Sequence, residues 1–233
     1  MSNSHPFTSK PIGRSLLFAL LALLIFFSSV AYLLLTPCNV ISLDINPSIE
    51  LETNRIDRVV SINALNADGE ELLAGYTPRD RDLDEVIEDL VDRMIFKGYI
   101  APGLQNDILI TVRDTNSSEH VLDKVNTSIA DYVEQRQMQV QLYAQQFTGN
   151  DKLQELAAGY QVSAGKMELI RRLLNGDPTL SIDELTTMRI SDIIAYATAN
   201  NIPLPVLDDM LDDLDDIYGD DRFDDIFDDD MLD

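Results

Sequence analysis

Residues 39–53 read NVISLDINPSIELET, and apolar and polar side chains alternate along them on either side of Asn46 and Pro47. Such alternation is typical of half-buried β-strands, so we expect strands over residues 39–45 and 48–53. Proline pushes the residue before it out of helical geometry, which favours a turn at this point. The stretch therefore predicts two strands joined by a tight connection.

The bond between Asn46 and Pro47 also has unusual covalent chemistry. In the usual ageing reaction of asparagine, the backbone N–H of the following residue attacks the side chain. This reaction cannot occur before proline, because the proline nitrogen carries no hydrogen. The intramolecular reaction that remains is attack of the Asn46 side-chain nitrogen on its own carbonyl carbon. This attack would expel Pro47 as a free amine and cut the chain. In most proteins such a bond is inert, and the alternative interpretation is an ordinary turn.

The alternation continues beyond these two strands. Residues 58–65 predict a third strand that ends at the turn signal NADG of residues 66–69, and residues 107–112 predict a returning strand. Between them, apolar side chains recur at helical spacing over residues 83–94, with Gly98 as the C-terminal stop. Strands and helix together predict a small α+β domain, with a mixed β-sheet and helices that cover it.

Residues 118–201 have a helical pattern. A stripe of apolar side chains begins at Val121, and a glutamine-rich stretch continues the helix to Gln146. Ser181 and Glu184 match a capping box, the pair of side chains that satisfies backbone N–H groups at a helix start. Shorter helices are expected over residues 152–158, 163–174 and 191–200. We assign residues 39–150 to the α+β domain and residues 151–201 to a helical extension.

Residues 15–35 form an uncharged apolar run of about 20 residues, long enough to cross about 30 Å of hydrocarbon as a helix. Lys10 and Arg14 precede the run and no acidic residue occurs before Asp44, so the positive-inside rule keeps residues 1–14 in the cytoplasm. A cleaved signal peptide is the alternative, but the run is longer than the usual stretch of about 7 to 15 residues. We interpret it as the signal anchor of a single-pass plasma-membrane protein with an extracytoplasmic C-terminal domain.

The composition excludes several classes of function. The formal charge is −24, and since Lys10 and Arg14 supply +2 before the apolar run, the remainder carries −26. Such a surface repels nucleic acid and anionic lipid. One cysteine and two histidines make neither a disulfide framework nor a histidine-based metal site. No nucleophile–base pattern of a conventional hydrolase is evident, so we expect no cofactor, metal, nucleic-acid partner or small-molecule substrate.

Residues 206–233 form an acidic tail that holds fourteen aspartates and one arginine, Arg222. Apolar residues keep a helical spacing among the charges, which is typical of a disordered, solvated tail that can fold onto a partner. An alternative function follows from this tail. In that case the chain is a membrane-anchored interaction domain that is not cut and acts through its acidic end.

Residues 39–73 resemble the extracytoplasmic middle domain of RsgI-type anti-sigma factors, in which a similar string follows the single membrane span. Residues 162–170, the pair Asp177-Pro178 and the pair Glu184-Leu185 resemble the helical part of relatives. The match extends from about residue 39 to about residue 197. Members of the family carry a folded sigma-binding domain before the span, whereas residues 1–14 are too few to bury a core. We therefore expect this chain to lack that cytoplasmic domain.

The resemblance implies that the protein cuts itself between Asn46 and Pro47, with the Asn46 side chain as nucleophile. It further implies that the two pieces stay together through the first strand. Loss of the outer piece then exposes the membrane stub to an intramembrane protease, and this frees a sigma factor. Since we expect no sigma-binding domain in this chain, a separate cytoplasmic regulator is a further expected partner. Asp44, Ser48 and Glu50 are the polar neighbours expected to move protons, and Asp44 would share a strand face with Asn46. Strain in the tight connection would help distort the amide.

Overall fold

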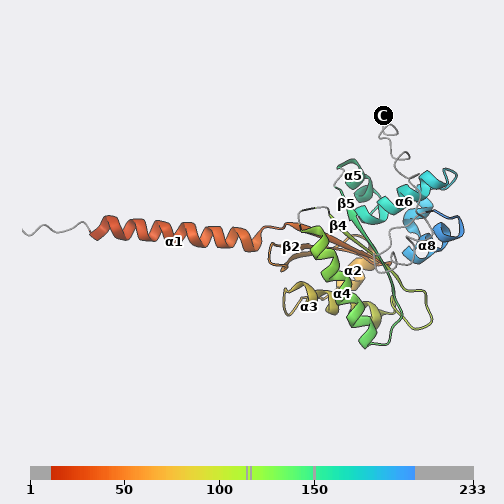
Figure 1. Ribbon diagram of the computed structural model, residues 1–233, viewed down its shortest axis with the longest axis horizontal. Coiled ribbons are helices and arrows are strands. Elements are labelled where there is room, and N and C mark those ends of the chain that lie inside the picture. The colour runs from red at the N-terminus through yellow and green to blue at the C-terminus, as the bar shows by residue number, and fades with distance from the viewer. Residues whose placement is uncertain (1–11, 114, 116, 149–150, 203–233) are drawn as a thin grey trace, which may run out of the picture.

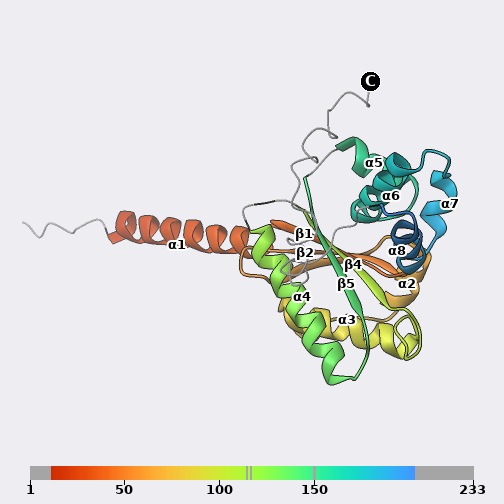
Figure 2. The same ribbon diagram turned by 45° about the vertical axis from the view of Figure 1, so that its right-hand side comes forward.

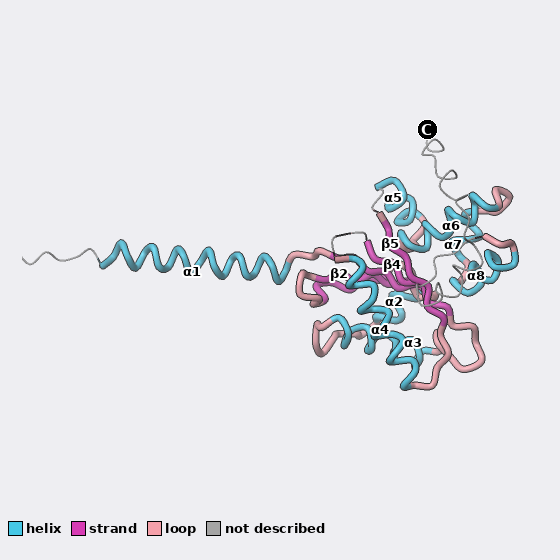
Figure 3. The backbone as a smooth tube through the Cα atoms, viewed as in Figure 1, coloured by secondary structure: helices cyan, strands magenta, loops and turns pink. Residues whose placement is uncertain are grey.

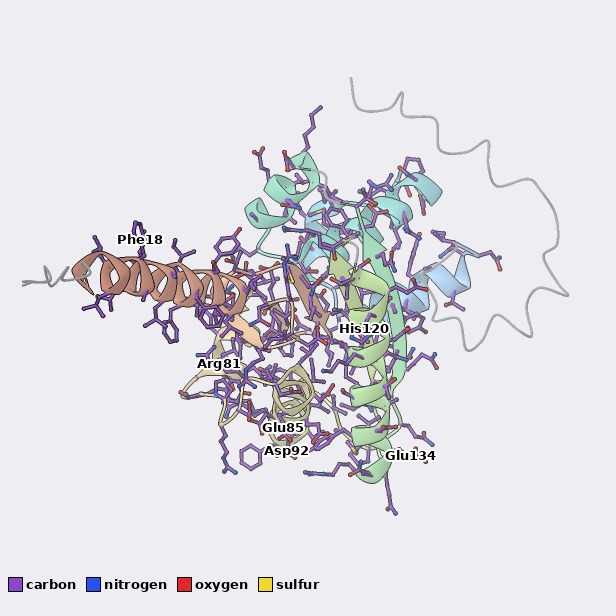
Figure 4. All side chains as sticks on the ribbon, turned by 60° about the vertical axis from the view of Figure 1, so that its left-hand side comes forward. Phe18, Arg81, Glu85, Asp92, His120 and Glu134 are labelled. Carbon is purple, nitrogen blue, oxygen red and sulfur yellow. The ribbon has the colours of Figure 1, made fainter. Side chains whose placement is uncertain are left out.

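The computed structural model describes residues 12–113, 115, 117–148 and 151–202. A long helix, α1 (Ile12–Leu35), projects from a folded domain in which a β-sheet lies between two groups of helices (Figure 1). The side chains of α1 from Leu16 onward, Phe18 among them, point outward around the helix (Figure 4). The segment Leu16–Leu35 is long and apolar enough to cross a membrane, as expected of a single-pass protein.

The sheet has five strands in the order β3-β2-β1-β4-β5, which Figure 3 shows in magenta. They are β1 (Asn39–Asp44), β2 (Ser48–Thr53), β3 (Val59–Ala64), β4 (Asp107–Arg113) and β5 (Gln141–Phe147). β1 is the central strand and pairs antiparallel with both β2 and β4, whereas β4 and β5 are parallel. The α+β fold with a mixed sheet is therefore confirmed, and so are the four strands predicted from alternation.

One face of the sheet packs against α2 (Ala67–Leu73), α3 (Leu83–Lys97) and α4 (Ser118–Gln135) (Figure 2). Asp82 caps the start of α3, and Gly98 ends it with a φ of 81°, the left-handed conformation that glycine adopts without steric penalty. The alternate side chains of the strands that point to this face are apolar and buried. They include Ile41, Leu43, Ile49, Leu51, Ile108, Ile110 and Val112.

The opposite face carries α5 (Asp151–Gly159), α6 (Ala164–Gly176), α7 (Ile182–Thr187) and α8 (Ile190–Ala199), which we call the helical layer. A second apolar core forms there around Leu109 of β4, and it includes Leu169, Ile170 and Ile193. α6 lies very close to β4, because a Cβ atom on Gly165 would lie 2.5 Å from the Cβ atom of Thr111. Because glycine has no Cβ atom, it is the residue that this short distance between helix and strand allows.

Two expectations for these regions are wrong. The glutamine-rich stretch is not helical, because residues 141–147 form β5 beside β4. Its period of two is real, with Leu142 and Ala144 toward one core and Tyr143 toward the other, but the glutamines between them hid the alternation. The NADG signal is not a turn either, because Asn66 is the N-cap of α2 and the following residues are helical.

The capping box is only partly present. Ser181 is the N-cap residue of α7, but its side chain makes no capping hydrogen bond. The division of the outer chain at residue 150 stays a prediction. The acidic tail of residues 206–233 and most of the 1–14 stub lie outside the described residues.

The contact of α6 with β4 gives a first prediction. Replacing Gly165→Ala places a methyl group against the Thr111 side chain, and such overpacking costs about 1–3 kcal/mol. We expect a lower urea midpoint for the full chain in detergent, followed by tyrosine fluorescence because the chain has no tryptophan. Gly159→Ala is the matched control, since no atom of the residues that the structure describes lies within 4 Å of its added Cβ. Equal midpoints for the two variants would contradict the contact.

Candidate functional site

The connection between β1 and β2 turns on a single residue. The strand pairing ends at Asp44 and Ser48, and beyond it the Ile45 N–H donates to the Pro47 carbonyl at 3.0 Å. Asn46 alone forms the apex, and its φ of 136° is a backbone conformation that residues other than glycine rarely adopt. Backbone strain of this kind costs about 1–3 kcal/mol. The predicted tight connection is thus strained at the residue whose carbonyl carbon is bonded to Pro47.

Both sides of the molecule hold this apex in place. From the helical layer, the Ile190 N–H donates to the Ile45 carbonyl at 3.2 Å. From the end of β3, the Leu65 N–H donates to the Ser48 carbonyl at 3.0 Å. Since strained backbone persists only where its surroundings fix it, these bonds are what keeps the Asn46 conformation.

The side chain of Asn46 is half-buried and is bound by Asn66. The Asn66 Nδ2 donates to the Asn46 Oδ1 at 3.3 Å. The Asn66 Oδ1 accepts from the backbone N–H of Ser48 at 3.1 Å and from that of Gly69 at 2.8 Å. Reasoning from sequence missed Asn66, because it was taken as part of a turn. An asparagine followed by two acidic residues within a short helical turn would have indicated a helix N-cap.

Asp44 is the last residue of β1, two residues before Asn46, and it is fully buried. The Ser163 hydroxyl, at the N-cap of α6, donates to its Oδ2 at 2.5 Å, while its Oδ1 has no hydrogen-bond partner among the described residues. Burial raises the pKa of the Asp44 carboxyl above its usual value. The hydroxyls of Ser163 and Ser48 and the charge of Lys166 act in the opposite direction. The result is a carboxyl that resists ionisation next to the Asn-Pro bond.

Lys166 extends this buried polar cluster into the helical layer. Its side chain is almost fully buried, and its Nζ donates to the carbonyls of Thr186 at 2.9 Å and Met188 at 2.6 Å. Its backbone N–H donates to the Ser163 Oγ at 2.8 Å. Burial lowers the pKa of Lys166, whereas the charge of Asp44 raises it. Sequence reasoning did not single out Ser163 or Lys166 for the site, since both are more than a hundred residues from Asp44 in the chain.

The structure brings together the polar residues predicted for the site only in part. Asp44, Ser48 and Glu50 lie on one face of the sheet, because Asp44 pairs with Ser48 and Glu50 follows two residues later. Burial raises the pKa of Glu50, Arg113 lowers it, and the charges of Glu52 and Asp44 raise it further. β1 ends at Asp44, so the shared strand face does not extend to Asn46, whose side chain bonds with Asn66 instead.

Away from the apex, a hollow lies between α3 and α4 and is lined by charged and polar side chains, among them His120, which Figure 4 labels. The Lys124 Nζ lies 3.3 Å from the Asp84 carboxylate and 3.6 Å from that of Asp57. The Ser128 hydroxyl also donates to Asp84. Such partly exposed ion pairs contribute about 0–1 kcal/mol each. We assign them a structural role in holding the two helices together.

A family model described as the anti-sigma factor RsgI-like central domain matches residues 38–172. Anti-sigma-I factor RsgI7 of Acetivibrio thermocellus is 25% identical over 178 residues, which cover 74% of this chain and 32% of the relative. Anti-sigma-I factor RsgI6 of the same organism is 24% identical over 192 residues, covering 76% and 25%. Anti-sigma-I factor RsgI4 is 37% identical over 79 residues, covering 34% and 15%. The chain thus spans about a third or less of the length of these curated relatives.

The burial of Asp44 gives a prediction with a definite sign. Its pKa is raised in the folded state, so its contribution to stability is complete below the ordinary value of 3.8 and is lost as pH rises through the folded pKa. We expect Asp44→Asn to gain in melting temperature relative to the wild type as pH rises from about 5 to about 8. Lys166, Glu50 and the two serine hydroxyls face Asp44 in the wild type and remain in the variant.

Asp177→Asn is the control of opposite sign. Hydrogen bonds from Thr179 and Tyr196 lower the pKa of Asp177, so its contribution is present above its ordinary value of 3.8 and is lost as pH falls. The difference between this variant and the wild type should therefore stay constant over the same pH range. A constant difference for Asp44→Asn as well would contradict the raised pKa.

Proposed function

This chain belongs to the RsgI-like anti-sigma factor family, and from that premise we propose that it is a membrane-anchored signalling protein that cuts itself between Asn46 and Pro47. The family match confirms the resemblance seen in residues 39–73. Helix α1 supports a single membrane span, and Lys10 and Arg14, which precede its apolar segment Leu16–Leu35, support a cytoplasmic N-terminus. The cut, its consequences and the orientation are parts of the proposal.

The observation that carries this proposal is the strained one-residue apex at Asn46, followed by proline. In the reaction, the Asn46 Nδ2 forms a bond to the Asn46 carbonyl carbon, and the bond from that carbon to the Pro47 nitrogen breaks. One proton leaves Nδ2 and one is gained by the proline nitrogen, so no atom enters or leaves. The products are residues 1–46 ending in a succinimide ring and residues 47–233 beginning with a free proline amine. Later opening of the ring adds one water.

We assign the movement of these protons to Asp44, Ser48 and Glu50. A carboxyl whose pKa is raised exchanges its proton closer to neutral pH, which suits an acid–base role. Asp44 is the nearer of the two carboxyls to the apex in the chain, and its buried Oδ1 has no hydrogen-bond partner within the described part of the chain. Leaving of the proline nitrogen is the step that needs a proton donor, and Asp44 is the donor that we favour.

The contacts of β1 support retention of the two pieces after the cut. β1 belongs to the N-terminal piece, whereas its partners β2 and β4 both belong to the C-terminal piece. Ile41, Leu43 and Ile45 of the N-terminal piece are buried, and each contributes about 1.5–3 kcal/mol. Two further bonds cross between the pieces near the membrane helix. The Cys38 N–H donates to the Thr53 carbonyl at 2.7 Å, and the Asn54 Nδ2 donates to the Leu34 carbonyl at 2.6 Å.

The retained strand suggests how a signal crosses the membrane. Removal of the C-terminal piece leaves α1 with a short outer stub, which becomes a substrate for an intramembrane protease. The relatives are named as anti-sigma-I factors, so we assign the output to a sigma factor or to a regulator that binds one. No small-molecule substrate is part of this scheme.

The cut itself gives the deciding experiment. Wild-type chain made by cell-free synthesis into nanodiscs should separate into two bands on a denaturing gel, with proline at the start of the larger one. By mass spectrometry the two fragment masses should add up to that of the intact chain, or exceed it by one water after ring opening. Asn46→Ala should give one band. Asn201→Ala is the control, because Asn201 also has a positive φ but precedes isoleucine. A wild type that stays intact favours the interaction domain that acts through residues 206–233.

Retention gives a separate prediction. Leu43→Ala removes a fully buried side chain from β1, and such a change costs about 2–5 kcal/mol. We expect the N-terminal piece of the cut variant to be lost at a lower urea concentration, measured by capture on a tag at the C-terminus. Val40→Ala, which shortens a side chain of the same strand that is only half-buried, is the control and should behave nearly as the wild type. Equal release from both variants would show that packing of β1 does not hold the pieces together.

A further inference from the structure

The Asn66 side chain makes three hydrogen bonds, two to residues at the apex and one to the first turn of α2. Its Oδ1 accepts from the Ser48 N–H, one residue after Pro47, and from the Gly69 N–H in the first turn of α2. Its Nδ2 donates to the side-chain oxygen of Asn46. One side chain therefore connects the backbone after the Asn-Pro bond, the start of a helix and the amide of Asn46.

These partners fix the orientation of both amides. The Ser48 and Gly69 N–H groups are donors only, so the Asn66 atom that faces them is its oxygen, and its nitrogen faces Asn46. The Asn46 atom that meets this nitrogen is then its oxygen. The final torsion of an asparagine side chain is broad and roughly two-fold, so without such a partner the Asn46 amide would populate both orientations. With Asn66 in place, the Asn46 nitrogen is held on the side away from Asn66.

The packing around Asn66 leaves little room for another arrangement. A Cβ atom on Gly69 would lie 2.5 Å from the Ser48 carbonyl oxygen and 3.2 Å from the Asn66 Oδ1. The first turn of α2 therefore lies directly against the backbone that follows Pro47. This close contact prevents Asn66 from moving away from the apex.

We propose that Asn66 is a positioning residue for the self-cleavage, and that it selects the orientation of the Asn46 amide in which nitrogen, not oxygen, is free to attack the carbonyl carbon. The inference rests on the proposed function, because it concerns the rate of that reaction. A hydrogen bond donated to the Asn46 oxygen also withdraws electron density from the amide, which makes the proton on Nδ2 easier to remove. Asn66 itself forms no covalent bond in the reaction.

Asn66→Asp separates positioning from structure. Aspartate caps a helix as well as asparagine, so its first oxygen keeps the bonds to Ser48 and Gly69. Its second oxygen is an acceptor, and it draws the Asn46 amide into the opposite orientation, with nitrogen engaged and oxygen toward the carbonyl. We expect cleavage about a hundredfold slower than in the wild type, with an unchanged melting temperature. The rate is followed by pulse labelling of the full chain in cell-free synthesis into nanodiscs, and for the pH series the labelled chain is transferred to buffer of the chosen pH.

The pH dependence supplies a readout that loss of structure does not move. Below about pH 4 the new carboxyl takes up a proton and its O–H can donate to the Asn46 oxygen. The ratio of the variant rate to the wild-type rate should therefore rise toward one as pH falls. Asp44 on β1 and Asp68 and Glu70 in the first turn of α2 are the acids that flank the site, and both proteins contain them.

Two further variants complete the test. Asn201→Asp makes the same isosteric change at an exposed position outside the site and should cut at the wild-type rate. Asn66→Ser keeps a capping oxygen, lacks an amide donor, and serves if the aspartate variant does not fold. It should also cut slowly, without recovery at low pH.

The outcomes are distinguishable. A wild type that stays intact overturns the proposed function and this inference with it. A wild type that is cut, together with Asn66→Asp cut at the same rate, overturns this inference alone. A slow variant with a lowered melting temperature and a rate ratio that is constant with pH shows a purely structural role, and also overturns it.

Discussion

The strand pair β1–β2 has to reverse direction over one residue, and this constraint governs the whole site. Because the Ile45 N–H is hydrogen-bonded to the Pro47 carbonyl, the reversal falls on Asn46 alone, which adopts a φ of 136°. Strain of about 1–3 kcal/mol is small beside the burial of three apolar side chains, Ile41 and Leu43 in β1 and Ile45 just after it, at about 1.5–3 kcal/mol each. The sheet can therefore impose the strained conformation without losing its own stability.

Two groups of elements meet at this apex from opposite sides of the sheet. On one side, β3 and α2 bring Leu65 and Asn66 to the backbone after Pro47. On the other, α6 and α8 bring Ser163 to Asp44 and Ile190 to the carbonyl of Ile45. The apex is thus complete only when both groups are docked, which makes its geometry a property of the whole domain rather than of the hairpin.

How much the sequence predicts depends on where the responsible partner lies. Alternation along residues 39–53 is local, so it predicts β1, β2 and the tight connection between them. β5 was missed because its glutamines obscure the period, and because pairing with β4 brings Gln145 to Thr111 across 34 residues. The bond from Ser163 to Asp44 spans 119 residues and leaves no local pattern. Asn66 had a local signal, its place before an acidic helix turn, but that signal resembles an ordinary turn.

The proposed order of events follows from these contacts. Asn46 reaches its strained conformation only after β1 lies between β2 and β4, so folding has to precede the cut. Breaking the bond to Pro47 releases the strain at the apex but removes no ladder bond, no buried side chain and neither bond near α1. The cut chain is therefore held by nearly all the interactions that folded the intact one. What changes is that β1 no longer has a covalent link to β2. The N-terminal piece can therefore separate as a single strand, and the rest of the domain does not have to be pulled apart with it. A bond cut early in this way turns the later separation of β1 into the step that a signal can control.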